Sequence, residues 1–289
     1  MKIKYLLPAF LFIALTSMKS DKPAYRFFTS QGKDSSYEKV LKAAEDADIV
    51  FFGEMHNSPI CHWLELELTK DLYADKKDKL VMGAEMFETD NQLILSEYLG
   101  GEISQRNFEE EAKLWKNYKT DYKPLVEFAK DHNVPFIATN VPRRYAALVN
   151  KKGFEGLESL SPQAKKYLPP LPIPYDPELP GYKGMLAMMG DAPSHMSANL
   201  PKAQAIKDAT MAYFILKNWS PGETFLHYNG SYHSQNNEGI IWYLKQSNPN
   251  LKIVTIASEE QEQLNELDSA YVGRGDFLLI VPEDMTKTN

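Results

Sequence analysis

The residue types best suited to chemistry occur in two short motifs of the form Gly-x-x-His, GEMH at 53–56 and GSYH at 230–233. Each motif follows a short apolar run that predicts a β-strand. The glycine lets the backbone turn sharply off the strand end and direct the imidazole inward. In an open parallel sheet, ligands bind beyond the carboxyl ends of the strands. We therefore expect the side chains of His56 and His233 to meet at that edge of a sheet.

Charged side chains lie toward the end of one further predicted strand and after another, at the same edge of the sheet. Glu85 lies inside the apolar run at 80–87, and Arg143 follows the run at 134–138. A buried carboxylate costs several kcal/mol unless it is paired, so we expect a cation or Arg143 to meet Glu85. The predicted catalytic residues are Glu54, His56, Glu85, Arg143 and His233, and the predicted metal ligands are His56, Glu85 and His233.

This set of side chains fits two kinds of enzyme chemistry. Imidazole nitrogens and carboxylate oxygens suit a divalent ion such as Zn, Mn or Co. In a metal-dependent hydrolase, a glutamate that does not bind the ion could act as a general base toward a metal-bound water. Without a metal, histidine and glutamate could perform esterase-like acid–base chemistry, with Arg143 holding an oxyanion. A lone histidine after a strand is commonly a surface or cap residue, so this interpretation depends on the two motifs together.

A proline-rich segment at 162–193 differs in character from the rest of the chain and includes the run LPPLPIPYDPELPGYKG. Proline at this density argues against a regular helix or a central strand, and long loops of this kind are usually lids or binding loops. Methionines often provide adaptable packing, but together with aromatic faces they suit a flat hydrophobic ligand. The predicted ligand-contacting residues are Tyr175, Tyr182, Met185, Met189 and His195.

Short apolar runs alternate with helical patterns along most of the chain. The predicted strands are 48–52, 80–87, 134–138, 225–228, 252–256 and 277–281. The predicted helices are 59–73, 91–99, 108–116, 124–132, 140–150, 201–217 and 239–246. This alternation predicts a three-layer α/β fold, with a mainly parallel sheet covered by helices on both faces. We expect a single domain at 21–289, with a helical and proline-rich lid insertion at about 155–200.

The N-terminal 20 residues have the pattern of a signal peptide. Lys2 and Lys4 precede an apolar stretch at 5–15, and small or polar residues follow. The stretch is shorter than the roughly 20 apolar residues that span a bilayer. Cys61 is the only cysteine, so a lipoprotein attachment has no acceptor near the predicted cleavage site. We therefore expect export to the periplasm or another extracytoplasmic space. The net charge of −7 argues against nucleic acid as a partner.

Five motifs occur in the order of a known family: GEMHNSPICH at 53–62, GAEMF at 83–87, TNVPRR at 139–144, AQAIKDATMA at 203–212 and NGSYH at 229–233. Over residues 48–256 the chain resembles the ChaN-like haem-binding lipoproteins, which are related to Tiki and TraB proteins and to erythromycin esterases. The resemblance implies haem binding in iron uptake, two haems stacked at a homodimer interface, and an outer-membrane uptake partner. It also implies an alternative, a Tiki-like metal-dependent peptidase.

The resemblance also assigns residues. The motifs match the family's shared polar site at Glu54, His56, Glu85, Arg143 and His233, and its helix motif at Gln204 and Asp208. It implies a tyrosine or His195 as the ligand of ferric haem, since tyrosine ligates haem iron in catalase. The chain departs from the family in lacking the lipoprotein cysteine. It also has Glu65 in place of a common glutamine, and Lys207 in place of a common arginine, which forfeits bidentate pairing.

Overall fold

A computed structural model of the chain describes residues 22–189 and 198–288, without the side chains of 187–189. The predicted signal peptide at 1–20 and the predicted ligand residue His195 lie outside the described residues. No helix within the described ranges is both long enough and apolar enough to cross a membrane.

The centre of the described structure is one mixed sheet in the order β2-β1-β8-β7-β3-β6-β4-β5. Its strands are β1 (Arg26–Thr29), β2 (Asp34–Ser35), β3 (Ile49–Glu54), β4 (Leu80–Glu88), β5 (Phe136–Asn140), β6 (Thr224–Gly230), β7 (Ile253–Gln261) and β8 (Phe277–Pro282). The strands from β8 to β5 run parallel, whereas β1 pairs antiparallel with both β8 and β2. Every residue of β3, β4 and β6 is buried, as expected for central strands covered on both faces.

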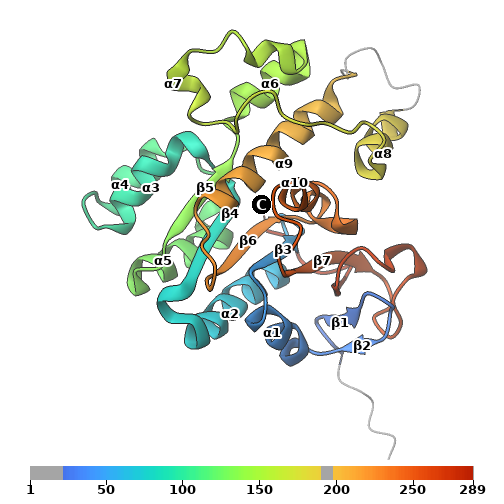
Figure 1. Cartoon of the computed structure of the whole chain (residues 1–289). Helices are drawn as coiled ribbons and strands as arrows, with labels where there is room; N and C mark the ends of the chain where they lie inside the picture. The colour runs from blue at the N-terminus through green and yellow to red at the C-terminus, as the bar shows by residue number, and fades with distance from the viewer. Residues whose placement is uncertain (1–21, 190–197, 289) are drawn as a thin grey trace, which may run out of the picture.

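Helices cover both faces of the sheet and form two separate hydrophobic cores. One face packs against α1 (Tyr37–Glu45), α2 (Pro59–Lys76), α3 (Gln92–Leu99), α4 (Gln105–Glu111) and α5 (Lys123–His132). The other face packs against α6 (Arg143–Lys152), α9 (Leu200–Lys217) and α10 (Ile240–Ser247). In Figure 1, α1 and α2 lie below the central strands β3 and β6, with α9 and α10 above them. The predicted three-layer α/β fold with a mainly parallel sheet is therefore confirmed.

The predicted elements match the structure closely, but some ends are shifted and some elements were not predicted. The short N-terminal elements β1, β2 and α1 were not predicted. The helix expected at 108–116 ends earlier, at Glu111, because Ala112 has extended backbone angles. The chain then passes through a π-helical turn, η3 (Tyr118–Tyr122), into α5.

The expectation that the proline-rich segment contains no regular helix is wrong. It contains α7 (Pro162–Lys165) and α8 (Pro180–Met189), and each begins with a proline. Proline is well tolerated at the first helical position, where the backbone N–H has no intrahelical acceptor to lose. Helix α8 packs against α9, and the chain between α7 and α8 has neither helix nor strand. Proline therefore sets where these helices begin.

Candidate functional site

The two Gly-x-x-His motifs lie side by side at the carboxyl edge of the sheet. Strands β3 and β6 pair in parallel, which places Gly53 opposite Asn229 and Glu54 opposite Gly230. His233 ends the short 3-10 turn η5 (Ser231–His233) that follows β6. The fold thus brings together two segments that are far apart in the sequence, because their strands are neighbours in the sheet.

The glycines of the two motifs are needed for close packing, and the structure corrects the reason inferred from the sequence. Neither has a positive φ, so neither is required by a left-handed turn. A Cβ atom on Gly53 would lie 2.7 Å from the carbonyl oxygen of Ile256 and 3.0 Å from the Cα of Ser231. A Cβ atom on Gly230 would lie 2.8 Å from both Cε1 and Nε2 of His56. Each glycine therefore lets its own motif approach the other.

A chain of buried ionic contacts begins at Glu85 on β4. Its Oε2 accepts the backbone N–H of Gly230 at 2.9 Å, and its Oε1 lies 3.1 Å from Nε2 of His233. His233 Nδ1 donates to Asp208 on α9 at 2.5 Å. The other oxygen of Asp208 accepts from the hydroxyl of Tyr182 on α8 at 2.7 Å. All five residues are buried, so this network joins the sheet edge to α9 and α8.

The charges in this network stabilise one another. Burial alone would raise the pKa of Glu85, but His233, with His56 and Lys207, holds that pKa below its usual value. Burial alone would lower the pKa of His233, but Glu85 and Asp208 together raise it to about 9. His233 is therefore a cation at neutral pH, with protons on both ring nitrogens. The proposal that it ligates a metal requires the ion to displace one of those protons.

His56 has a different environment from His233. Its Nδ1 donates to Glu54 Oε1 at 2.7 Å, and the same oxygen accepts from the Tyr122 hydroxyl at 2.7 Å. Its ring packs edge-on against Trp115, with 4.9 Å between ring centroids. The His56 side chain is 45% exposed, whereas Glu54 is fully covered. Glu54 therefore orients an imidazole that solvent or a ligand can reach.

A pocket of about 500 Å³ opens beside His56 and Glu85, between α6 and α9. Its lining includes apolar side chains, two cations, one imidazole and two carboxylates. The apolar part includes Trp115, Val141, Ala146, Leu200 and Ala203, and the titratable part comprises His56, Glu85, Glu88, Arg143 and Lys207. Its volume is within the range of about 300–1,000 Å³ that small-molecule sites occupy.

Arg143 lies at this pocket but does not pair with Glu85. Its Nε donates to Glu88, and the cation that meets Glu85 is His233. The adjacent Arg144 pairs with Asp90. The arginine pair at the start of α6 is thus held by Glu88, the last residue of β4, and by Asp90 in the turn that follows. The sequence suggested a cation or Arg143 beside Glu85, and the side chain that lies there is that of His233.

Tyr175, Tyr182 and Met185, the predicted ligand residues whose side chains the structure describes, lie outside the pocket lining. Tyr182 is buried, and its hydroxyl donates to Asp208. Tyr175 is half-buried, with its ring centroid 5.6 Å from that of Tyr182. Met185 is half-buried on α8, and the side chains of Met189 and His195 are outside the described residues. Burial and Asp208 raise the pKa of Tyr182, which disfavours the phenolate needed for iron ligation.

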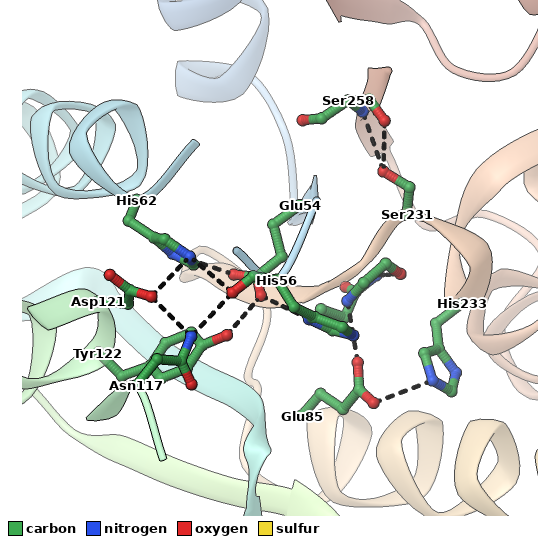
Figure 2. Close-up of polar contacts among 12 residues, drawn as sticks. Glu54, His56, His62, Glu85, Asn117, Asp121, Tyr122, Ser231, His233 and Ser258 are labelled. Carbon is green, nitrogen blue, oxygen red and sulfur yellow. Dashed lines mark hydrogen bonds and ion pairs between the residues drawn. The ribbon is translucent and has the colours of Figure 1, made fainter. Parts of the chain in front are cut away.

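A second buried cluster lies on the other side of Glu54, and the sequence analysis did not place it in the site. Figure 2 shows His62, Asp121 and Tyr122 to the left of Glu54, with Glu85 and His233 to the right. Ligand atoms of Glu54, His62 and Glu65 all lie within 4.8 Å of one another. The i, i+3 spacing of His62 and Glu65 on the helix after the first motif is the sequence signal that points to this cluster.

Comparisons with known proteins give one family and several similar folds. A family model described as haem-binding uptake, Tiki superfamily, ChaN matches residues 40–244. No curated protein sequence matches the chain. A solved structure of cofacial haem binding to ChaN of Campylobacter jejuni has 16% identity and a TM-score of 0.62, covering 89% of this chain and 96% of that one.

Two other solved structures have lower identity. A succinoglycan biosynthesis protein has 10% identity and a TM-score of 0.51, with 90% of this chain and 94% of that one covered. An erythromycin esterase in an open conformation has 12% identity and a TM-score of 0.48, covering 89% and 83% of the two chains. At such identities the similarity to ChaN and to the succinoglycan biosynthesis protein shows a shared fold.

Proposed function

Because the chain belongs to the haem-binding uptake family of the Tiki superfamily that includes ChaN, we propose that it binds haem in the pocket between α6 and α9. The observation that supports this most directly is the pocket itself, where an accessible imidazole lies among apolar and cationic side chains. The ChaN structure with cofacial haem shares the fold. The proposal concerns one ligand, haem, and one surface, the pocket beside His56.

The pocket side chains fit the two chemical parts of haem. The ring is flat and apolar, and Trp115, Val141 and Leu200 offer apolar surface. The two propionates are anions, and Arg143 and Lys207 lie in the same lining. Hydrogen bonds to charged groups are the stronger ones in proteins, so these two cations would orient the ring. Bound haem would supply the iron that an uptake protein carries.

His56 is the pocket residue best placed to hold the iron. Histidines that ligate metals commonly donate their other ring nitrogen to a carboxylate, which fixes the tautomer and ring orientation. Glu54 accepts from Nδ1 of His56 in this way, which leaves Nε2 as the nitrogen for a ligand. The ligand from the proline-rich segment that the sequence predicted, Tyr175 among others, is the competing choice.

Titration of the purified chain with ferric haem tests the proposal. We expect a shifted, intensified Soret band that saturates at a fixed ratio of haem to protein. His56→Ala should change the band and weaken binding, whereas His132→Ala should not, because His132 is exposed and bonds only to its own helix at Phe128. A free-haem spectrum at stoichiometric protein contradicts the proposal. If Tyr175→Phe loses the Soret band and His56→Ala keeps it, the iron ligand lies in the proline-rich segment and not at His56.

The cellular role proposed with haem binding is uptake outside the cytoplasm. The signal-like pattern at residues 1–20 and the family description support it. Stacked haems at a homodimer interface and an outer-membrane partner belong to the same proposal. Fractionation of the native cells tests the location, and sedimentation with and without haem tests the dimer. A cytoplasmic chain that keeps residues 1–20 contradicts the location.

A hydrolase acting at the same pocket is the second candidate. The hydrogen bond between Glu54 and His56 favours it, because a carboxylate that orients an imidazole is a common general-base arrangement. A metal-dependent peptidase or esterase requires an ion at His56, Glu85 and His233. Elemental analysis of protein purified without chelator, combined with peptide and ester hydrolysis assays, tests this candidate. Absence of stoichiometric metal together with unchanged hydrolysis in His56→Ala counts against it.

A further inference from the structure

The buried cluster behind Glu54 contains more acceptor atoms than donors. Glu54 is 2% exposed, His62 6% and Glu65 0%. Within the described part of the chain, Glu54 Oε2 and Glu65 Oε1 are buried oxygen atoms without a hydrogen-bond partner. Buried carboxylate oxygens are normally satisfied, because leaving them without a donor costs free energy. Without an added proton or cation, the cluster therefore has too few donors for its carboxylate oxygens.

The hydrogen bonds of His62 fix which of its nitrogens can act as a ligand. Nε2 lies 3.1 Å from the backbone carbonyl oxygen of His56. A carbonyl oxygen only accepts hydrogen bonds, so Nε2 carries a proton and donates it. In a neutral ring, Nδ1 is then a bare acceptor. It faces Glu65 Oε2 at 3.1 Å and Glu54 Oε2 at 3.5 Å, so three acceptors converge on one point.

The neighbouring Asp121 supplies no donor to these three acceptors. Asp121 Oδ2 lies 3.4 Å from Nε2 of His62, on the side of the ring away from the two glutamates. The same oxygen already accepts from Asn117 at 2.6 Å and from Thr288 at 2.7 Å. Asp121 therefore adds negative charge beside the cluster and favours a cation in it.

We propose that Glu54, His62 and Glu65 form a buried site for a divalent transition-metal ion such as Zn²⁺ or Mn²⁺, separate from the pocket. Tetrahedral ligands at about 2.1 Å from an ion lie about 3.4 Å apart, close to the two contacts of His62 Nδ1. One imidazole nitrogen and two carboxylate oxygens suit ions of borderline character. The His56 carbonyl behind His62 is the kind of acceptor that orients ligating histidines.

This site would share one carboxylate with the pocket. Glu54 Oε1 accepts from His56 in the pocket wall, and Glu54 Oε2 faces the cluster. An ion in the cluster therefore fixes the carboxylate that orients the pocket imidazole. The site has a function that does not depend on the pocket ligand, because it neutralises buried charge whether or not haem is bound.

Protons are the alternative means of neutralising the cluster. Burial, together with Glu65, raises the pKa of Glu54 to about 8, and burial together with Asp121 raises the pKa of Glu65 to about 8. A proton shared between the two carboxyl groups would join them by a hydrogen bond. Since an ion must displace such protons, ion binding should release protons and strengthen as the pH rises. The two states differ in composition and are separable by experiment.

The test uses haem-free chain that has been stripped with chelator and returned to buffer. Zn²⁺, Mn²⁺ and Co²⁺ are added one at a time, and bound metal is measured after equilibrium dialysis. We expect one ion per chain, a melting temperature that rises with ion concentration, and d–d absorption bands with Co²⁺. A chain that retains none of the three ions at pH 8 overturns the proposal and favours shared protons.

Matched variants distinguish this site from the pocket. Glu65→Gln keeps the side-chain shape and removes one ligand, and we expect affinity to fall at least about tenfold. Glu67→Gln, on the same helix but at a partly exposed position, should bind as the wild type does. Glu85→Gln should also retain the ion, because Glu85 lies in the pocket lining. Loss of the ion in Glu85→Gln with retention in Glu65→Gln overturns the assignment. Should Glu65→Gln fail to fold, His62→Gln takes its place, and wild-type affinity in it would also overturn the proposal.

Discussion

Replacing either motif glycine by alanine should give two distinct defects, because the added methyl group meets different neighbours. In Gly230→Ala it meets the ring of His56 at 2.8 Å and lies 3.6 Å from Glu85 Oε2. The His56 ring is at the end of a partly exposed side chain, so it can move away. In Gly53→Ala the methyl group meets backbone atoms, the oxygen of Ile256 at 2.7 Å and the Cα of Ser231 at 3.0 Å. Backbone within a sheet cannot move as cheaply.

The expected magnitudes follow from this contrast. Overpacking a core costs about 1–3 kcal/mol, and we place Gly230→Ala at about 1 kcal/mol and Gly53→Ala at about 3 kcal/mol. Gly230→Ala should nevertheless lose most haem affinity, since moving the ring breaks the bond from His56 to Glu54. Gly184→Ala is the control, because none of the described atoms lies within 4 Å of its added methyl group.

Urea unfolding and haem titration of the three variants measure these effects separately. Gly53→Ala should lower the free energy of unfolding most, and Gly230→Ala should lower haem affinity at nearly normal stability. The packing argument is refuted if Gly53→Ala and Gly230→Ala are equally stable. The role given to His56 is refuted if Gly230→Ala binds haem with wild-type affinity and spectrum.

Three further predictions concern the charged groups around the pocket. Tyr182→Phe removes the hydroxyl that donates to buried Asp208 and should lower the free energy of unfolding by about 1–3 kcal/mol in urea. Burial alone would lower the pKa of His233. Glu85 and Asp208 outweigh this effect and raise that pKa from 6.5 to about 9. Its contribution to stability is therefore complete below pH 6.5 and is lost as the pH rises through about 9, and His233→Gln should flatten that part of the stability–pH curve. Lys207→Ala should weaken haem binding by about 1.5 kcal/mol in low salt, whereas Lys202→Ala, beside the ring of Phe154, should not.

The main strands could be predicted because burial on both faces of the sheet leaves a direct mark on the sequence. Strands β3 and β4 begin with apolar runs, and every residue of β3, β4 and β6 is buried, which is typical of parallel strands between two helical layers. Strand β1 pairs with β8 from the opposite end of the chain. It has four residues, and the first and the last of them are only half-buried. A short strand of this kind depends on a distant partner, which no local pattern reveals.

The partner of Arg143 could not be predicted because it depends on an irregularity in strand pairing. Strands β4 and β5 are in regular register up to Ala84, and the register then shifts so that Glu88 lies opposite Asn140. The shift brings Glu88 to the start of α6, where it accepts from Arg143, and leaves Glu85 facing β6. Spacing along one strand cannot reveal a bulge that is defined by two strands.

The buried position of Glu65 could have been inferred from the sequence. Leu68 and Leu72, three and seven positions after Glu65 on the same helix, are both almost fully buried, which places residue 65 on the helical face that covers the sheet. A carboxylate inside such an apolar stripe requires a partner. The same argument predicts a partner for Glu85, and the partner in the structure is His233.

The two histidines occupy matching positions in matching motifs but differ in exposure and in their carboxylate partners. His233 lies between two carboxylates, which keep it protonated and buried. His56 bonds to one carboxylate through Nδ1, and its side chain is 45% exposed at a pocket. A protonated imidazole has no lone pair for a metal, so an incoming iron or ion must displace a proton at His233. Burial lowers the pKa of His56, but Glu54 and Glu85 raise it overall, so the advantage of His56 as a ligand is its exposure at the pocket. His233→Gln should therefore reduce stability more than haem affinity, and His56→Ala should do the reverse. Equal loss of haem affinity in both variants would show that both rings ligate and that the ionic network opens when haem binds.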